Sequence, residues 1–273
     1  MKFRRSERLI DMTNYLLEHP RQLVSLSYFA EKYGSAKSSI SEDLTIIKET
    51  FEQRGIGILQ TLPGAAGGVK YQVKVNEQDA KPFIEELCEL IMKPDRLLPG
   101  GYLYMTDILG DTALVQKVGK LFASAFADTN IDVVMTVATK GIPLAYAVAN
   151  YLNVPVVMVR RDSKVTEGST VSINYVSGST KRIQTMLLSK RSLEEGSRVL
   201  IVDDFMKAGG TVNGMISLLE EFNAYVAGIA VLVEAEEAEE RLVDDYLSLV
   251  KLSGVDVKEK RISVEMGNYF DQQ

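Results

Sequence analysis

The residues with the clearest chemical potential are Asp203 and Asp204, which directly follow the apolar run Val199–Val202. Three residues later comes the small-residue sequence AGGT at positions 208–211. A buried strand that ends in acids and leads through a small-residue loop into a helix is typical of α/β ligand sites, because ligands bind at the carboxyl ends of parallel strands.

Each part of this stretch has a chemical use. The start of a helix offers unpaired N–H groups and the positive end of the dipole, both of which favour a phosphate. Gly209 and Gly210 allow close backbone approach and positive φ, and the Thr211 hydroxyl can bind the same phosphate. Paired acids can accept hydrogen bonds from two ribose hydroxyls or help to retain Mg²⁺. We therefore expect a ribose 5-phosphate site, in preference to two acids that merely cap a helix.

Strands and helices that alternate after residue 130 must position this site. Unalternated apolar strands separated by single helices predict a parallel sheet covered on both faces. The expected strands are Asp132–Val137, Val154–Val159, Val199–Val202 and Val226–Val233, with helices to about Leu152 and over about 212–222. Helices are also expected at Asp79–Met92 and Asp111–Ala127, residues 75–100 are interpreted as a linker plus the entry to the second domain, and Glu234–Asp245 as a solvated helix surface.

The N-terminal part has a different pattern, which predicts three helices and a hairpin. Apolar spacing places helices at Ser6–His19, Leu26–Tyr33 (capped by Ser25 or Ser27 and ended by Gly34) and Lys37–Arg54. In the third, Ile40, Leu44, Ile47 and Phe51 form one apolar stripe, and Ser39 with Glu42 has the form of a capping box. Ile58–Leu62 and Val69–Val75 are strand-like around the glycine-rich loop 63–68. This is the order of a winged helix-turn-helix.

Charge and composition narrow the class of protein. Residues 1–74 carry eleven Lys and Arg against eight Asp and Glu, a net charge of +3, so the −6 of the whole chain leaves −9 on the rest. A basic N-terminal segment followed by an acidic remainder is typical of a protein whose N-terminal domain binds a polyanion. The single Cys88 and single His19 exclude a disulfide framework, a multi-thiolate metal site and a histidine relay. With no apolar run of membrane length and no apolar leader, we expect a cytoplasmic protein.

The sequence VLIVDD, three further residues and AGGT resembles the signature with which type I phosphoribosyltransferases bind phosphoribosyl pyrophosphate (PRPP). VATKGIP (Val137–Pro143) resembles their pyrophosphate loop, Arg160 and Arg161 the basic position near it, and Asp162–Lys181 their mobile loop. No base-binding hood is recognisable in the last 40 residues. The resemblance covers roughly residues 100–250 and implies the parallel-sheet fold of that family.

Three sequences narrow the resemblance to the purine repressor family of Gram-positive bacteria: AKSSISEDL (36–44), PGAAGGV (63–69) and DDFMKAGGT (203–211). That family implies a dimeric repressor of purine synthesis and salvage operons, with a winged-helix DNA-binding domain (residues 1–74). This domain is joined to a phosphoribosyltransferase-like domain (residues 75–273) that senses PRPP as inducer, with Mg²⁺ as an optional companion of PRPP, and is not known for catalysis. Lys207 and Ala208 depart from the usual enzyme motif and support this. The PRPP-binding residues so implied are Tyr102, Thr139, Lys140, Gly141, Arg160, Asp203, Asp204, Phe205, Met206, Lys207, Ala208, Gly209, Gly210 and Thr211; no resident metal, cofactor or catalytic residue is expected.

The expected partners are operator DNA, PRPP and a second copy of the chain. Guanosine alarmones are expected to compete with PRPP for the same phosphate-binding residues. A recognition helix would present its polar side to the major groove, while basic residues of the first helix and the wing hold phosphates. The DNA-binding residues expected are Arg4, Arg5, Arg8, Lys37, Ser38, Ser39, Ser41, Glu42, Thr45 and Lys70. The alternative is an active purine phosphoribosyltransferase with an appended regulatory DNA-binding domain.

Overall fold

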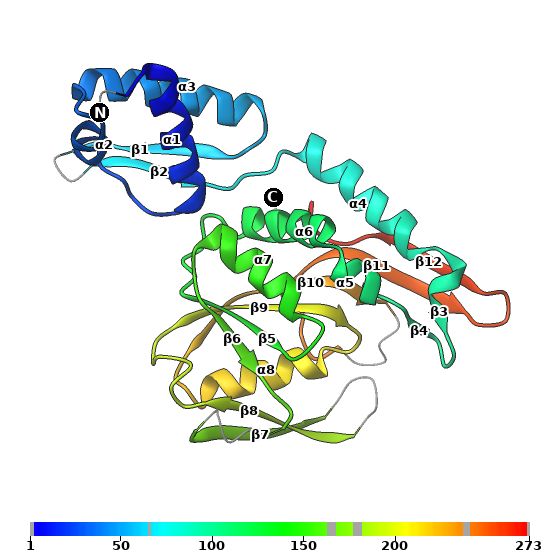
Figure 1. Ribbon diagram of the computed structural model, residues 1–273. Helices are drawn as coiled ribbons and strands as arrows, with labels where there is room; N and C mark the ends of the chain where they lie inside the picture. Colours follow the sequence, from blue (N-terminus) through cyan, green and yellow to red (C-terminus); the bar gives the residue numbers. More distant parts are fainter. Residues whose placement is uncertain (1–2, 65–66, 163–167, 177–181, 237–240, 272–273) are drawn as a thin grey trace. The chain divides into compact units, whose positions relative to one another are not determined.

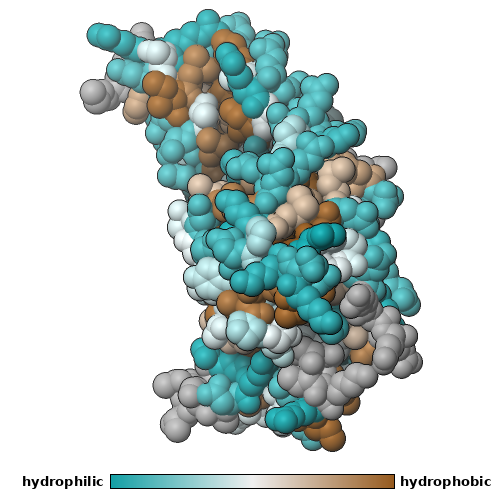
Figure 2. Space-filling model, turned by 90° about the vertical axis from the view of Figure 1, so that its right-hand side faces the viewer, coloured by the Kyte–Doolittle hydropathy of each residue, from teal (hydrophilic) through white to brown (hydrophobic). Residues whose placement is uncertain are grey.

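The computed structural model describes the chain except residues 1–2, 65–66, 163–167, 177–181, 237–240 and 272–273. It divides into two compact units, one of residues Met1–Asn76 with Tyr151–Asn153, the other of Glu77–Asn150 and Val154–Gln273. Hydrophilic side chains predominate on the face drawn in Figure 2, where apolar ones gather in small patches. Across the described part of the chain, every helix is too short or too polar to cross a membrane.

Three helices and a hairpin form the first unit (Figure 1). The elements are α1 (Arg5–Glu18), α2 (Leu26–Tyr33), α3 (Lys37–Gln53), β1 (Ile58–Leu62) and β2 (Gly68–Gln72). β1 and β2 pair antiparallel, and Val24 adds a bridge to Val69 of β2. This is the predicted winged-helix order, and residues 65–66 of its glycine-rich loop lie outside the described residues.

Local sequence explains where these helices begin and end, with one error. The Ser25 hydroxyl accepts from the Tyr28 N–H at 3.1 Å, and Gly34 ends α2 with a left-handed φ of 57°. The predicted apolar stripe of α3 is fully buried in the core of the unit. The predicted capping box of Ser39 and Glu42 is wrong, because α3 already begins after Ala36 and Ser39 lies inside its first turn.

The second unit is built on a six-stranded sheet in the order β12-β11-β10-β9-β5-β6. Every neighbouring pair is parallel except β11 and β12. The strands are β5 (Val133–Val137), β6 (Val156–Val159), β9 (Arg198–Met206), β10 (Tyr225–Ala235), β11 (Leu247–Asp256) and β12 (Arg261–Met266). The sheet is therefore mostly parallel, as predicted, with an antiparallel edge strand that the sequence pattern did not reveal.

Helices and a hairpin cover the two faces of this sheet (Figure 1). α8 (Gly210–Glu220) packs with the antiparallel hairpin of β7 (Thr170–Val176) and β8 (Ile183–Ser189) on one face. α6 (Thr112–Ala125) and α7 (Ile142–Leu152) lie on the other, so close together that a Cβ on Gly119 would be 2.5 Å from the Ala147 Cβ. Parallel strands buried on both faces explain the unalternated apolar runs.

The structure bears on three expectations about this unit. Residues 75–100, interpreted as a linker plus the entry to the second domain, include the expected helix as α4 (Glu77–Ile91). Its apolar side packs on β11 and β12, so the chain belongs to the folded unit from Glu77 onward. Part of the expected mobile loop is strand β7, residues 163–167 and 177–181 of it lie outside the described residues, and its mobility stays a prediction. Glu234 and Ala235 belong to β10, and the described residues 241–245 are not helical, so the acidic stretch Glu234–Asp245 is not a helix surface there.

Candidate functional site: a cavity at the end of strand β9

Strand β9 extends beyond its neighbour β5, and this difference in length creates the site. Val199 to Ile201 pair with β5, whereas pairing with β10 continues to Met206. We expected the strand to end at Val202; that is wrong, because hydrogen bonding to β10 keeps the backbone extended through both acids. Asp203 and Asp204 therefore lie on a strand that β5 no longer flanks, at the carboxyl edge of the sheet, where ligands bind in α/β folds.

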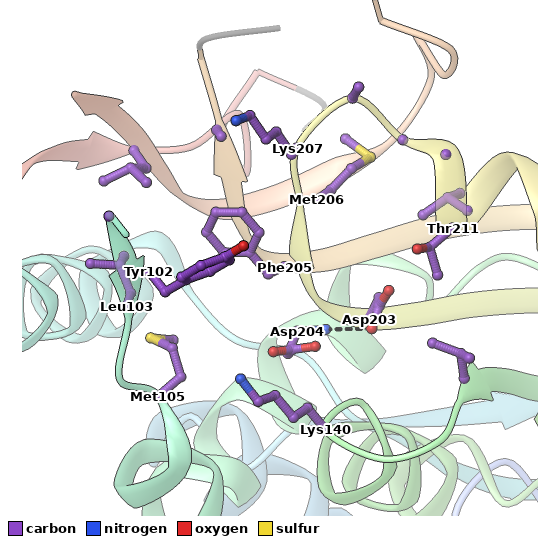
Figure 3. Close-up of a pocket in the computed structure, with 18 of the residues that line it drawn as sticks. Tyr102, Leu103, Met105, Lys140, Asp203, Asp204, Phe205, Met206, Lys207 and Thr211 are labelled. Carbon is purple, nitrogen blue, oxygen red and sulfur yellow. Dashed lines mark hydrogen bonds between the residues drawn. The ribbon is translucent and has the colours of Figure 1, made fainter. Parts of the chain in front are cut away.

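A cavity of about 730 Å³ opens at this edge (Figure 3). Its floor is the chain from Asp203 to Val212, and the loop after β5 faces it. The remaining walls come from the hairpin of β3 (Leu97–Leu98) and β4 (Tyr102–Leu103) and from the β11–β12 region. Besides 203–212, the lining residues are Gly100, Gly101, Tyr102, Leu103, Met105, Val137, Ala138, Thr139, Lys140, Arg161, Ala235, Leu252, Gly254, Val255 and Val257.

Asp203 is more deeply buried than Asp204, and the pKa of both carboxyl groups is raised. Asp203 is 4% exposed, and its Oδ1 accepts from the Asp204 N–H at 3.0 Å. Burial, and then the neighbouring charge of Asp204, raise the pKa of Asp203. Burial also raises the pKa of Asp204, against the opposing charge of Lys140, whose side chain points toward it in Figure 3. The pair is therefore a strong acceptor for hydroxyl groups or a cation that enters the cavity.

The turn after β9 has the backbone that an anion requires. Gly209 is the N-cap of α8 with a φ of 81°, a left-handed conformation that glycine adopts without strain. No side chain caps the start of α8, and Gly210 and Thr211 form its first turn. The N–H groups of this turn and the positive end of the helix dipole are thus directed to the cavity, where the sequence predicts a bound phosphate.

Most of the predicted ligand-binding residues meet in this cavity. Tyr102, Thr139, Lys140 and the whole of 203–211 line it. Gly141 lies beneath the loop instead, where a Cβ would be 3.2 Å from Asp203 Oδ1 and 2.2 Å from Thr136 Oγ1. Arg160 does not line the cavity and its backbone pairs with Leu187, whereas the exposed Arg161 does line it.

Sequence reasoning missed two walls of the cavity. Gly100 lies in the segment 75–100 that was interpreted as a linker, and Gly101, Leu103 and Met105 follow it, although the Pro-Gly-Gly run at 99–101 signals a tight turn. The other wall comes from the β11–β12 region, for which no local motif exists.

A buried arginine fixes the β3–β4 hairpin in place. Arg96 is 5% exposed and donates two hydrogen bonds of 2.7 Å to the Asp107 carboxylate. It also donates to the carbonyls of Leu90 at 2.6 Å and Tyr104 at 3.0 Å. The guanidinium lowers the pKa of Asp107, so the pair is charged at neutral pH. The hairpin that presents Tyr102 is therefore tied to both α4 and α5 (Thr106–Gly110).

The predicted DNA-binding residues lie mostly on one exposed helix side. Lys37, Ser38, Ser41, Glu42 and Thr45 of α3 are exposed, Ser39 is half-buried, Arg4 is exposed at the start of α1, and Lys70 is half-buried on β2. α3 thus presents a polar side that fits a recognition helix.

Arg8 forms an ion pair that the sequence did not predict. It donates from Nε at 3.0 Å and from Nη2 at 2.8 Å to Asp43 Oδ2, and its side chain is 13% exposed. Arg5 donates to Asp43 Oδ1 at 2.9 Å and lies 3.7 Å from Glu42, with half of its side chain exposed. Asp43 is fully buried, so these arginines tie α1 to α3, and the phosphate contact of Arg8 stays a prediction.

Comparison with known proteins agrees with both units. Residues 4–73 match the family described as "Bacterial purine repressor, N-terminal", and residues 105–267 match the phosphoribosyl transferase domain. The purine biosynthesis transcriptional repressor PurR of Bacillus subtilis is 68% identical over 99% of this chain and 95% of its own length. The chain belongs to the bacterial purine repressor family.

Two further similarities place this purine repressor family member among its neighbours. The purine biosynthesis transcriptional activator PurR of Lactococcus lactis is 48% identical over 99% of this chain and all of its own. The adenine phosphoribosyltransferase of Thermoanaerobacter pseudethanolicus superposes with a TM-score of 0.54 and 26% identity, over 62% of this chain and 99% of that one. The second unit thus has the phosphoribosyltransferase fold, and the first is the part specific to the repressor family.

Proposed function

We propose that the protein is a DNA-binding transcriptional repressor of purine biosynthesis and transport genes, with PRPP as its inducer. The observation that carries the proposal is that one chain has both an N-terminal domain of the purine repressor family and a cavity lined by paired acids and a glycine turn. Similarity along the whole chain to a relative named as a repressor supports the sign of regulation. Transcription from a purine promoter with added protein tests that sign, since an activator would increase it.

PRPP fits the order of groups around the cavity. The Gly209–Thr211 turn suits the 5-phosphate, and Asp203 and Asp204 suit the two ribose hydroxyls. The diphosphate would then face Lys140 and Arg161, two cations that line the cavity on segments outside the turn. Titration of PRPP by calorimetry tests this arrangement, and unchanged affinity after Asp203→Ala and Asp204→Ala together would contradict it.

Mg²⁺ would arrive with the diphosphate rather than reside in the protein. Among the described residues no cluster of three or more His, Cys, Asp and Glu side chains forms a metal site. Asp204 and the phosphate oxygens offer the hard oxygen ligands that Mg²⁺ prefers. Guanosine alarmones carry diphosphates of the same charge, and we propose that they compete for the same cations; an unchanged PRPP affinity in excess alarmone would remove this part of the proposal.

Regulation requires that PRPP and operator DNA oppose each other. By linkage, PRPP must weaken operator binding by the factor by which the operator weakens PRPP binding. We propose a homodimer, because two winged helices can address paired half-sites. Gel-shift titration of a purine promoter at fixed salt, with and without PRPP, tests the coupling, and equal PRPP affinity with and without operator would refute it.

An active purine phosphoribosyltransferase is the rival function, favoured by the fold shared with adenine phosphoribosyltransferase. Incubation with PRPP, Mg²⁺ and each purine base discriminates the two. We expect no pyrophosphate release above background, and sustained release would favour the enzyme.

A further inference from the structure

The turn that would hold the 5-phosphate is supported from behind by a segment outside the cavity's polar lining. The Leu242 N–H donates to the Ala208 carbonyl at 2.9 Å. A Cβ added to Gly209 would be 3.1 Å from Val243 Cγ2. The segment 241–246 therefore fixes the position and orientation of the turn, although Leu242 and Val243 are not among the residues that line the cavity.

Both ends of this segment are held by one buried carboxylate. Glu234 is 5% exposed, and its Oε2 accepts from Arg241 Nη1 at 2.7 Å and from the Tyr246 hydroxyl. Its Oε1 accepts from Ser248 Oγ at 2.7 Å. Arg241 also donates from Nη2 to the Ala235 carbonyl at 2.8 Å and lies 5.3 Å from the Tyr246 ring centroid. A buried carboxylate is costly unless it is paired and hydrogen-bonded, and here three donors satisfy it.

The sheet register places this carboxylate beside the start of the turn. Glu234 lies opposite Met206, the last residue of β9 before the turn begins. The cluster of Glu234, Arg241 and Tyr246 is thus anchored on β10, next to the strand end from which the turn departs.

We propose that Arg241 and Glu234 form a brace that positions the Ala208–Gly209 turn for the ligand's 5-phosphate without touching the ligand. This inference rests on the proposed ribose-phosphate site. Hydrogen-bond donors that are held in place before binding give higher affinity, because less ordering is left to the moment of binding. Loss of the brace does not change the residues of the turn, but it allows the backbone of the turn to shift, so that its N–H groups move away from the phosphate.

The brace predicts a selective loss of affinity. It supports the turn at 208–211, whereas a diphosphate faces Lys140 and Arg161 on other segments. Removing it should therefore weaken ligands that carry the 5-phosphate and spare inorganic pyrophosphate. General misfolding of the unit would weaken both, so selectivity separates positioning from a merely structural role.

Calorimetric titration of the full-length protein with ribose 5-phosphate, PRPP and inorganic pyrophosphate tests the proposal. Arg241→Gln should raise the Kd of ribose 5-phosphate and of PRPP about tenfold, the lower range for outer-shell support, and change that of pyrophosphate less than twofold. Arg198→Gln is the matched control, since it breaks an exposed arginine–carboxylate pair with Asp132 at the other end of β9 and should change nothing. Glu234→Gln provides a second variant, which keeps the shape of the side chain and should show the same selectivity.

Three results would overturn the brace, and the last of them would also overturn the proposed function. Equal losses for ribose 5-phosphate and pyrophosphate, or no loss for either, would overturn the brace alone if the unaltered protein binds ribose 5-phosphate. An unaltered protein that binds neither PRPP nor ribose 5-phosphate would overturn the proposed function together with the brace.

Discussion

Replacing Asp43 with alanine is expected to destabilise the winged-helix unit by about 3 kcal/mol, the lower end of the cost of breaking a buried ion pair. Asp43 is fully buried and accepts three hydrogen bonds, two from Arg8 and one from Arg5. The substitution leaves Arg8, with a side chain only 13% exposed, without its carboxylate. Arg5 adds little to the cost, because half of its side chain is in solvent and remains hydrated.

Urea unfolding of the full-length protein, followed by circular dichroism, measures this loss in the transition of the first unit. Glu42→Ala is the matched control, since it removes from the same helix an exposed carboxylate that lies 3.7 Å from Arg5, and it should cost under about 1 kcal/mol. A cost for Asp43→Ala that is no larger than that of the control would refute the reasoning.

The same pair makes a prediction for DNA binding. If Arg8 only joins α1 to α3, Arg8→Gln leaves the dependence of log Kd on log salt unchanged in the folded protein. Arg4→Gln, at an exposed position, should lower the magnitude of that slope by about 0.9, the value for one phosphate contact. An equal decrease for Arg8→Gln would show that Arg8 contacts phosphate after all.

Three further predictions concern the second unit. Because the pKa of Asp203 is raised in the folded state, the fold binds a proton more readily than the unfolded chain, so the free energy of unfolding falls as pH rises from 3.8 through the raised pKa. Asp203→Asn should flatten this dependence, raise the Tm at neutral pH and weaken PRPP binding about tenfold or more; a lower Tm would contradict it. Arg161→Ala should weaken PRPP binding about tenfold and Arg160→Ala less than twofold, since only Arg161 lines the cavity, and the reverse order would contradict the geometry. Burial raises the pKa of Cys88 to about 11, so about a thousandth of the thiol is ionised at pH 8, and native labelling by iodoacetamide should be slow but rapid in urea.

Local signals determined most of what the sequence could predict. The bounds of α2 follow from Ser25 and Gly34, whose cap and left-handed turn need no distant partner. The core stripe of α3 and the main strands of the sheet were predicted from periodicity and from apolar runs. The turn at 208–211 could also be read locally, because its residue types suit one backbone conformation.

Tertiary partners determined what the sequence could not predict. Arg8 was interpreted as a phosphate contact because its partner Asp43 is 35 residues away. Glu234 belongs to an acidic run that suggests a solvated surface, and only the donors of Tyr246, Ser248 and Arg241 allow its burial. The length of β9 depends on β10, so the run of apolar residues could not show that the strand continues past Asp203.

The unequal lengths of β5 and β9 give the molecule an internal reporter of occupancy. Successive amides of a strand point to opposite neighbours, so between Val202 and Met206 only some N–H groups are covered by β10. The remainder face the side that β5 has left, and the Asp204 N–H within this stretch donates to Asp203 Oδ1. Amide hydrogen exchange at this short stretch should therefore slow when the inducer binds, without a label and independently of DNA. The strand that carries the acids would then record, residue by residue, whether the cavity is filled.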